Sequence, residues 1–468
     1  MTIRFGTDGW RGIIADDFTF HNLRLASQAT AEYFQTVTDR ERTVLVGYDV
    51  RFLSQKFAAA AAEVFAGNGF RVLLMDRPYP TPYVSFEVQR QGLVGGVVIT
   101  ASHNPSIFNG FKVKAEYGGS ATSAITQIIE GRLGKTAVRT STTDIDTIAP
   151  SGEYFARLRS LIDWERIASS NLQVVVDAMH GSGGRLLEEM LAQTTVQVQT
   201  IRAEPDPLFD GISPEPMMPQ LEPLAAAVRR SGAAIGLATD GDGDRLGVVS
   251  NEGHFVPTLQ VLPLLLLHAY RHRGWRGSVV HTFSQSQLIE RIATQLTLDV
   301  VETPIGFKHI AELMLNGPVL IGGEESGGIG LSRHLPERDG LFLQILLLDL
   351  LATTGKGLTA LIGDMRTEFG EFHYHRRDLH VGSDASQQLI SALKEKPPKD
   401  FANRSVHEIR TLDGLKLMLE NDSWILFRRS GTEPVLRIYC EAPTETAVAE
   451  ILEAGINLAE QFAPSGVS

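Results

Sequence analysis

The 468-residue sequence is poor in cysteine, and Cys440 is its only one. A lone cysteine excludes an intrachain disulfide framework and is typical of a reducing compartment. The N-terminus lacks the apolar core of a signal peptide. The most apolar stretch, residues 341–352, is shorter than the roughly 20 residues that cross a bilayer. We therefore expect a cytoplasmic protein with no membrane partner, in which residues 341–352 form a buried helix.

Positive charge is also scarce, since 43 Lys and Arg residues face 55 Asp and Glu residues, for a formal net charge of −12. This balance argues against a general nucleic-acid or membrane-surface binder, which needs a net basic face. It does not exclude small phosphate ligands, which need only a few local cations. The sequence also lacks the Gly-x-Ser-x-Gly elbow of α/β-hydrolases, the dinucleotide-binding glycine fingerprint and the P-loop. NAD and P-loop chemistry are therefore disfavoured.

Short runs of Val, Ile and Leu alternate with helical stretches, which is the pattern of buried parallel strands joined by helices. The expected strands are 43–49, 71–75 and 96–100, then 172–177, 196–201 and 233–238, then 278–281, 299–302 and 319–321. The expected helices include 55–67, 185–192, 221–231, 287–295 and 308–316. In each of these three groups of strands, a polar loop follows the last strand, where open α/β sheets place their ligands.

The C-terminal residues break this pattern, with strands expected at 424–427 and 435–439 before a helix over 444–462. The sequence therefore predicts an α/β protein of three similar mixed or parallel α/β domains and a smaller α+β C-terminal domain. A prior of about 150 residues per domain gives three domains, but the repeat and the different C-terminus indicate four. We place the domains at residues 1–145, 146–253, 254–366 and 367–468.

Asp240, Asp242 and Asp244 alternate with glycine directly after an expected strand. Residues two apart in an extended backbone point the same way, so the three carboxylates converge. Mg²⁺ binds carboxylates together with phosphate oxygens. An EF-hand is excluded, because Arg245 replaces the required glycine and Asn251 the final glutamate. A solvated Asp- and Gly-rich turn is the alternative, but three carboxylates repel one another without a cation, which favours a metal site.

Ser102 lies in the sequence Thr100-Ala-Ser-His-Asn-Pro105, which follows the expected strand 96–100. It is either a nucleophile or a turn and helix-capping residue, and this segment alone does not separate the two roles. The nearby sequence Asn109-Gly-Phe-Lys112 offers a tight turn and a cation, which favours the nucleophile.

Three further loops carry polar groups suited to phosphates or sugars. Arg428–Pro434 combines arginines, hydroxyls and a glycine, as phosphate-binding loops do, although a polar hairpin has the same composition. Gly6–Gly12 has similar ingredients but is not distinctive by itself. Gly323–Gly328 contains Glu324 and Ser326, which suit sugar hydroxyls and equally suit an acidic turn at a helix N-terminus.

In their order along the chain these segments resemble the motifs of a known family, the α-D-phosphohexomutase superfamily of phosphoglucomutases and phosphomannomutases. The resemblance is carried by Gly6–Gly12, Thr100–Pro105, Asp240–Arg245, Gly323–Gly328 and Arg428–Pro434. It implies four domains, three of them alike, arranged around a central active-site cleft. It also implies an isomerase of the intramolecular phosphotransferase type that depends on magnesium.

The resemblance further implies roles for single residues. Ser102 would be the phosphoserine, and its phosphate would hold Mg²⁺ with Asp240, Asp242 and Asp244. The expected substrate contacts are Arg11, Lys112 and Arg245 around the transferring phosphoryl group, Glu324 and Ser326 at the sugar O3 and O4 hydroxyls, Lys308 as an extra phosphate contact, and Arg428, Ser430, Gly431 and Thr432 at the distal phosphate. Lys112, Arg11 or His103 would transfer the proton of the sugar hydroxyl.

The implied reaction interconverts hexose 1-phosphate and hexose 6-phosphate through phosphoserine and a bisphosphosugar intermediate, with sugar 1,6-bisphosphate as activator. Glu325 and Gly328 stand where mannose-leaning relatives carry Met and His and glucosamine-leaning relatives carry Gln and His. Gly306-Phe-Lys308 likewise resembles the phosphoglucomutase form. These differences favour glucose, keep mannose as a second substrate and make glucosamine the least expected.

Two alternatives stay open. The same site could serve a glucose-1,6-bisphosphate synthase, which uses a sugar bisphosphate as donor and releases the bisphosphate as product. A non-catalytic sugar-phosphate binding protein is the alternative of another class, although binding alone requires neither Ser102 nor three aspartates. The expected partners are small sugar phosphates and not nucleic acid, and the chain is expected to be a monomer or a dimer.

Overall fold

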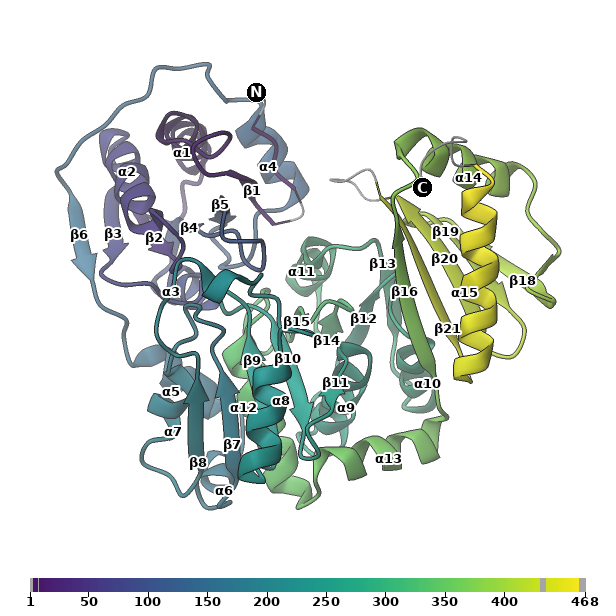
Figure 1. Cartoon of the computed structure of the whole chain (residues 1–468). Helices are drawn as coiled ribbons and strands as arrows, with labels where there is room; N and C mark the ends of the chain where they lie inside the picture. The colour runs from purple at the N-terminus through teal and green to yellow at the C-terminus, as the bar shows by residue number, and fades with distance from the viewer. Residues whose placement is uncertain (1–2, 7, 430–434, 463–468) are drawn as a thin grey trace. The chain divides into compact units, whose positions relative to one another are not determined.

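The structure, a computed structural model, describes residues 3–6, 8–429 and 435–462 (Figure 1). The chain divides into two units. One unit comprises Met1–Val280 with Gly306–Ile362, and the other comprises His281–Ile305 with Gly363–Ser468. The second unit therefore takes a short segment from the middle of the chain and joins it to the C-terminal residues.

The N-terminal part of the first unit contains a six-stranded mixed sheet, ordered β1-β5-β4-β2-β3-β6. Its strands are β1 (Trp10–Ile13), β2 (Glu41–Tyr48), β3 (Arg71–Met75), β4 (Leu93–Ile99), β5 (Phe108–Lys114) and β6 (Ile145–Ile148), and its helices are α1 (Phe20–Phe34), α2 (Ser54–Gly67), α3 (Thr81–Gln91) and α4 (Ser123–Glu130). The strands β2, β3, β4 and β6 pair in parallel, whereas β1 and β5 extend the sheet antiparallel.

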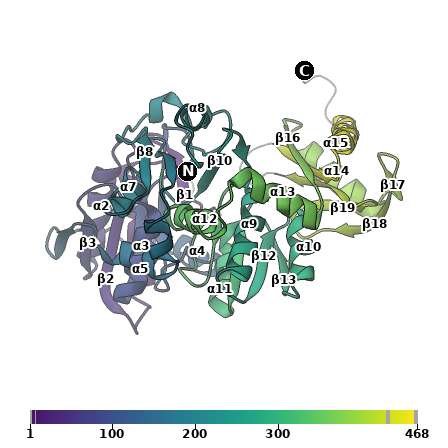
Figure 2. The ribbon, with the colours of Figure 1, turned by 90° about the horizontal axis from the view of Figure 1, so that it is seen from below.

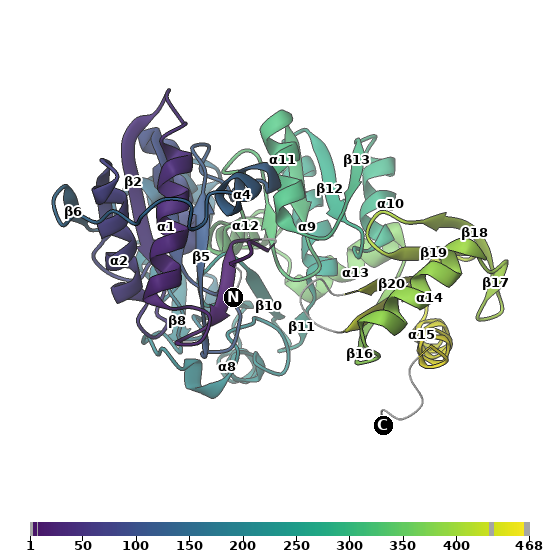
Figure 3. The same ribbon diagram turned by 90° about the horizontal axis from the view of Figure 1, so that it is seen from above.

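Helices cover both faces of this sheet, as buried parallel strands require. A Cβ atom built on Gly95 would meet Phe34 of α1, and one built on Gly96 would meet Val84 and Val88 of α3. Because neighbouring residues of a strand point to opposite faces, α1 and α3 lie on opposite sides of the sheet. Figure 3 shows α1 and α2 next to each other on one of these sides. The predicted strands and the predicted helix of this part are present.

The second sheet repeats the arrangement with the strand order β11-β10-β9-β7-β8. Its elements are α5 (Glu153–Ser160), α6 (Trp164–Ala168), β7 (Gln173–Asp177), α7 (Leu186–Leu191), β8 (Gln197–Ile201), a 3₁₀ turn (Phe209–Gly211), α8 (Glu222–Ser231), β9 (Ile235–Thr239), β10 (Leu246–Ser250) and β11 (Phe255–Val256). The pairs β7–β8 and β7–β9 are parallel, and β10 and β11 add an antiparallel edge. Apolar residues of α8 pack on one face of this sheet.

The third repeat of strands and helices follows in the same chain order. Its elements are α9 (Thr258–Arg271), β12 (Ser278–Thr282), α10 (Gln287–Gln295), β13 (Val300–Thr303), α11 (Phe307–Asn316), β14 (Val319–Gly323), β15 (Ile329–Gly330), α12 (Gly340–Thr354) and α13 (Leu358–Phe369). Every residue of α12 from Gly340 to Leu351 is buried, which confirms the helix predicted for the apolar stretch 341–352. Among the described residues no single helix is long and apolar enough to cross a membrane, and only α12 and α13 taken together, bent by 79°, have the length and composition to do so.

The C-terminal part of the second unit has a different architecture, a six-stranded antiparallel sheet ordered β16-β21-β20-β19-β18-β17. Its elements are β16 (His373–Leu379), α14 (Ser383–Glu395), β17 (Asp400–Phe401), β18 (Arg404–Arg410), β19 (Leu415–Leu419), β20 (Ser423–Arg429), β21 (Leu436–Ala442) and α15 (Glu445–Glu460). The helices α14 and α15 share one apolar core with alternating strand residues, so both cover the same face (Figure 2). The predicted fold class, repeated α/β domains followed by an α+β domain, is confirmed.

Candidate active site

The predicted serine lies in the loop between β4 and β5, and its side chain is 1% exposed. Its backbone φ of 52° is a left-handed conformation that non-glycine residues seldom adopt and that often marks a functional site. The backbone N–H of Ser102 donates to Thr100 Oγ1 at 2.9 Å. Its hydroxyl donates to Asp240 Oδ2 at 2.7 Å and lies 3.4 Å from His103 Nδ1. The loop therefore aims the hydroxyl at the predicted metal-binding loop.

One buried arginine holds the serine loop in this conformation. Arg51 follows β2, and its guanidinium pairs with Asp49 at 3.1 Å. The two terminal nitrogens of Arg51 donate to four backbone carbonyl groups of the loop, those of Ser102 (2.6 Å), Asn104 (2.6 Å), Pro105 (2.9 Å) and Phe108 (3.0 Å). Thr100 Oγ1 also donates to Asp49, at 2.6 Å. Asp49 and Arg51 thus form a rigid support beneath Ser102.

The acidic loop follows β9, and its glycines let it approach the serine loop closely. A Cβ atom on Gly241 would lie 2.6 Å from the carbonyl oxygen of Ser102, and Gly243 has a φ of 74°. Asp240 Oδ1 accepts the backbone N–H groups of Asp244 (3.0 Å) and Arg245 (3.1 Å). A side chain at either glycine would therefore push the two loops apart or strain the turn.

The carboxylates of Asp240, Asp242 and Asp244 are fully buried and converge as predicted, with one oxygen of each within 4.8 Å of the others. Within the described part of the chain, Asp242 Oδ1 and Asp244 Oδ1 have no hydrogen-bond partner. Burial, reinforced by the charges of Asp244 and Asp242, raises the pKa of Asp240 to about 8. Buried carboxylate oxygens without donors, held this close together, are the donor set that a hard divalent cation satisfies. The three aspartates therefore fit a Mg²⁺ ion.

Lys112 of β5 is the counter-charge of this loop. Its Nζ atom lies 2.8 Å from Asp242 Oδ2, from Asp244 Oδ2 and from Asp8 Oδ2. Burial would lower the pKa of Lys112, but the charges of Asp242, Asp244 and Asp8 outweigh it and raise the pKa. Lys112 is therefore a permanent cation whose three N–H donors are each directed at a carboxylate.

A second group of buried charges continues from the acidic loop. Arg338, at the start of α12, donates to Asp244 Oδ2 at 2.8 Å and also to Asp8. Glu337 accepts from Lys114 Nζ at 2.5 Å. Burial would raise the pKa of Asp8, but the charges of Lys112, Lys114 and Arg338 outweigh it and hold the pKa well below its ordinary value. These contacts join segments that lie as far as 330 residues apart in the sequence.

The predicted sugar loop joins β14 to β15 and contacts the acidic loop directly. The backbone N–H of Leu246 donates to the carbonyl of Gly327 at 3.2 Å. Glu324 is buried and lies 3.6 Å from Arg338, and burial raises its pKa against the charge of that arginine. A Cβ atom on Gly328 would lie 2.6 Å from Arg338 Cδ, so the arginine occupies the space that a larger residue would need. Ser326 is half-buried in the same turn.

Two arginines and a histidine complete the surroundings of Ser102. Arg11 donates to Asn104 Oδ1 at 2.5 Å. Arg245 lies 3.7 Å from Glu215, and its buried Nε atom has no hydrogen-bond partner among the described residues. Burial, together with the positive charges of Arg245 and Arg11, holds the pKa of His103 well below its ordinary value. His103 is thus a neutral imidazole beside the serine hydroxyl.

Lys308 and the residues of the predicted phosphate loop remain to be described. Lys308 is half-buried in the first turn of α11. Arg428 belongs to the second unit, where it lies at the end of β20 and donates to Asp413 Oδ2 at 3.0 Å. Ser430, Gly431 and Thr432 fall outside the described residues. The first unit therefore brings together Ser102, the aspartates and the sugar loop, and the predicted roles of the phosphate-loop residues stay predictions.

Five charged residues of this network lie outside the loops predicted from the sequence: Asp49, Arg51, Lys114, Glu337 and Arg338. Asp49 and Arg51 were predictable, because they stand at the end of a buried strand, where the other functional loops also begin. Glu337 and Arg338 lie just before the apolar helix α12. Charged residues are common at helix termini, so this pair alone does not indicate a functional site. Only the tertiary structure shows that both are buried.

Comparison with known proteins agrees with this architecture. Models of the family described as phosphoglucomutase/phosphomannomutase match all four parts of the chain: alpha/beta/alpha domain I over residues 2–139, domain II over 152–253, domain III over 259–369 and the C-terminal domain over 392–457.

Similar proteins extend over nearly the whole chain. A phosphoglucomutase/phosphomannomutase of Thermococcus kodakarensis is 29% identical over 464 residues, which is 98% of each chain. A probable phosphoglucosamine mutase of Pyrococcus abyssi is 30% identical over 454 residues, or 96% of each. The crystal structure of a putative phosphomannomutase from Thermus thermophilus, 35% identical, superimposes with a TM-score of 0.87 over 98% of this chain and 99% of that one. The chain therefore belongs to the phosphoglucomutase/phosphomannomutase family, a family of phosphohexomutase enzymes.

Proposed function

We propose that this protein interconverts hexose 1-phosphate and hexose 6-phosphate, with glucose as the preferred sugar, through a phosphorylated Ser102. The observation that carries the proposal is the meeting of two loops, in which the Ser102 hydroxyl lies 2.7 Å from Asp240 beside two further carboxylates. A site that only bound sugar phosphates would have no use for a serine held in a strained backbone conformation against an acidic loop.

In this proposal phosphoserine donates its phosphoryl group to the free hydroxyl of a monophosphosugar. The bond between phosphorus and Ser102 Oγ breaks, a bond from phosphorus to the sugar oxygen forms, and a bisphosphosugar results. After the sugar turns end for end, its other phosphoryl group returns to Ser102. Because phosphoryl transfer depends on positioning and charge neutralisation, the side chains that matter most are the cations and the support beneath the serine.

Asp240, Asp242 and Asp244 would hold Mg²⁺, which when bound neutralises charge on the transferring phosphoryl group and makes the serine oxygen a better leaving group. Arg11 and Arg245 would contact the equatorial phosphoryl oxygens. Arg245 suits this role because its buried Nε has no hydrogen-bond partner within residues 3–6, 8–429 and 435–462.

The geometry favours His103 for proton transfer over the other two candidates. The imidazole lies 3.4 Å from Ser102 Oγ and is neutral near pH 7, so it can accept the proton of an attacking hydroxyl. Lys112 is a poor base because three carboxylates hold its proton. Its proposed role is instead to orient Asp242 and Asp244.

Glucose is proposed as the preferred sugar because the sugar loop reads Glu324-Glu-Ser-Gly-Gly328 and Arg338 fills the space beside Gly328. Glu324 would accept hydrogen bonds from the sugar hydroxyls, and Ser326 would donate a hydrogen bond to them. Lys308 is proposed as an extra contact to the substrate phosphate. Arg428, with Ser430, Gly431 and Thr432, is proposed for the distal phosphate. A sugar 1,6-bisphosphate would activate the enzyme by phosphorylating Ser102.

The test is a coupled assay of glucose, mannose and glucosamine 1-phosphates in parallel, with Mg²⁺ and a trace of glucose 1,6-bisphosphate. We expect fastest turnover with glucose 1-phosphate and, by intact mass, one phosphate that is lost in Ser102→Ala. Ser106→Ala, in the same loop, is the matched control and should keep both properties. Turnover in Ser102→Ala, or consumption of the bisphosphate in proportion to product, would contradict the proposal. Faster turnover with glucosamine 1-phosphate would overturn the sugar assignment alone.

A further inference from the structure

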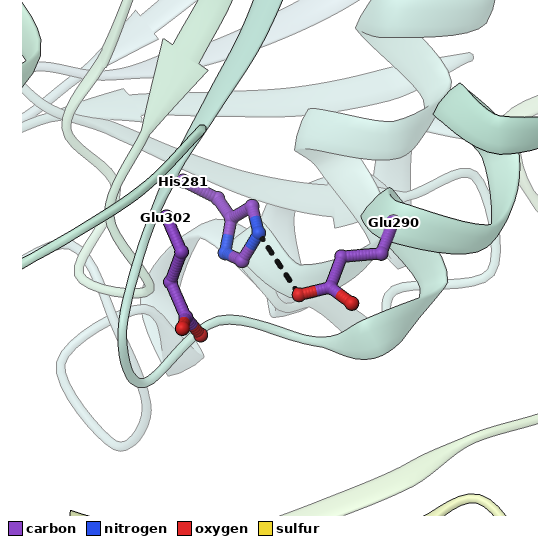
Figure 4. A group of neighbouring side chains, drawn as sticks. All are labelled: His281, Glu290 and Glu302. Carbon is purple, nitrogen blue, oxygen red and sulfur yellow. Dashed lines mark ion pairs between the residues drawn. The ribbon is translucent and has the colours of Figure 1, made fainter. Parts of the chain in front are cut away.

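A second group of metal-binding residue types lies in the second unit, away from the serine loop in sequence. His281 is the penultimate residue of β12, Glu290 lies in α10 and Glu302 lies in β13, so all three come from the segment His281–Ile305. One ligand atom of each lies within 4.8 Å of the others. Figure 4 shows the imidazole between the two carboxylates, with the edge that carries Nε2 facing Glu290.

The imidazole of His281 is held in one tautomer. Its Nδ1 atom lies 3.2 Å from the carbonyl oxygen of Thr282, and because a carbonyl only accepts, Nδ1 must carry the hydrogen. In neutral imidazole Nε2 then presents a lone pair. The side chain is 1% exposed, and Nε2 has no hydrogen-bond partner among the residues that the structure describes. A backbone contact to the far ring nitrogen is also the usual support of a metal-bound histidine.

The lone pair of Nε2 faces an acceptor. Glu290 Oε1 lies 3.4 Å from Nε2, and a carboxylate oxygen cannot donate to it. The buried lone pair of Nε2 and a carboxylate oxygen in contact with it repel each other unless a positive charge lies between them. Either a proton on His281 or a bound cation resolves the conflict, and the second carboxylate, Glu302, turns the pair into a three-ligand set.

Two cations already approach the carboxylates, but each has other partners. Arg410 lies 3.2 Å from Glu290 and 3.5 Å from Glu302, and it also pairs with Glu408 at 2.9 Å. Lys416 lies 3.3 Å from Glu302, donates to the carbonyl of Phe283 at 3.1 Å and stands 4.2 Å above the ring of Trp424. If the two carboxylates turn to a metal, Arg410 keeps its pair with Glu408, and Lys416 keeps its hydrogen bond to Phe283 and its contact with Trp424. Glu290, Glu302 and Glu408 against Arg410 and Lys416 leave one negative charge, so these surroundings favour a bound cation.

We propose that His281, Glu290 and Glu302 bind a Zn²⁺ ion that fastens β12, α10 and β13 to one another. One imidazole nitrogen with two carboxylates and a water is a ligand set that suits four-coordinate zinc, whereas Mg²⁺ prefers oxygen ligands alone. The side chains of Glu290 and Glu302 are 32% and 17% exposed, which leaves the ion a route from solvent. The site is structural, and it does not depend on the proposed function of Ser102.

The experiment uses the full-length protein, stripped with a chelator, exposed to Zn²⁺ in millimolar Mg²⁺ and dialysed before its zinc content is measured. We expect one equivalent of Zn²⁺ in the wild type and in Asp240→Asn/Asp242→Asn, which removes the all-oxygen site. His281→Gln and Glu302→Gln should lose that equivalent. His407→Gln, which alters an exposed histidine of the same unit, should retain it.

The variants could lose zinc by failing to fold, so binding is also followed by a second measurement. Zn²⁺ should raise the thermal midpoint of the wild type and leave that of Glu302→Gln unchanged, with circular dichroism showing both proteins folded at the start. Co²⁺ in place of Zn²⁺ should give the visible absorption of a four-coordinate site, absent from His281→Gln. Failure of the wild type to retain zinc, or equal retention by a folded His281→Gln, would overturn the proposal.

Discussion

Replacing Arg51 by lysine tests whether the support beneath Ser102 contributes to turnover. The substitution keeps the positive charge beside Asp49 and removes the planar fork that reaches the loop. The guanidinium makes five hydrogen bonds, one to Asp49 and four to backbone carbonyl groups between residues 102 and 108. An ammonium group has three N–H donors, so at least two of the five contacts must be lost even in the best rearrangement.

The expected loss follows from these contacts. A hydrogen bond to a charged group contributes about 1.5–3 kcal/mol, so two lost contacts correspond to about 3 kcal/mol at the lower end. If this energy is what keeps the Ser102 loop in place, the loop shifts in the variant. A displacement of about 1 Å at a reacting group reduces the rate by roughly 100-fold. We therefore expect kcat of Arg51→Lys to fall by about two orders of magnitude, with a much smaller change in KM, because Arg51 does not contact the proposed substrate site.

Two measurements separate positioning from folding. Turnover per folded molecule is measured by the coupled assay, and phosphate transfer to Ser102 from glucose 1,6-bisphosphate is followed by intact mass. Arg71→Lys is the matched control, because Arg71 forms an exposed pair with Asp146 on the neighbouring strand of the same sheet and should change neither quantity. A folded Arg51→Lys with wild-type kcat would refute the positioning role, even if its stability were reduced.

Three further predictions concern the metal, the sugar loop and a buried carboxyl. Asp242→Asn should raise the Mg²⁺ concentration needed for half-maximal turnover by about tenfold or more; an unchanged midpoint would contradict its role as ligand. Gly328→Ala should displace Arg338, and we expect a higher KM and a loss of about 1–3 kcal/mol of stability in denaturant unfolding. Gly152→Ala, with open space around it, should change neither KM nor stability. Burial raises the pKa of Glu441 from 4.5 to about 7, so the stability that its protonated form contributes is present below pH 4.5 and is lost as pH rises through 7. Glu441→Gln should reduce this loss of unfolding free energy by up to about 3 kcal/mol between pH 5 and 8. Parallel pH curves of unfolding for the variant and the wild type would contradict this prediction.

The parallel strands and their helices were predictable because their apolar runs are local. β3 and α10 have the predicted bounds, and α12 is buried as its composition indicated. Strand β5 was not predicted, and the reason is physical. Its polar residues Lys112 and Lys114 are buried only because carboxylates from distant segments neutralise them, and no local pattern in residues 108–114 reveals those partners.

The site was predictable to the extent that its residues are clustered in the sequence. Asp240, Asp242 and Asp244 converge because of their spacing, and a polar loop after a buried strand identified Ser102. The role expected for Lys112 shows where this reasoning ends. Its contact with the phosphoryl group, which the family resemblance implies, stays a prediction, whereas its contacts with three carboxylates follow from the packing of β5 against the acidic loop and Asp8. Likewise, Arg51 lies 51 residues from Ser102 in the sequence.

The buried charges around Ser102 suggest how a protein with a net charge of −12 would bind the sugar phosphates of the proposed function. Six buried carboxyl groups are packed with three cations in this network: Asp8, Asp240, Asp242, Asp244, Glu324 and Glu337 with Lys112, Lys114 and Arg338. The carboxyl groups outnumber the cations, so a bound Mg²⁺ ion would offset negative charge in this network. Arg11 and Arg245 lie beyond this balance and would be left to meet the phosphoryl group. In this arrangement the acidic residues would hold the metal, and through it they would contribute to binding an anion that they would otherwise repel.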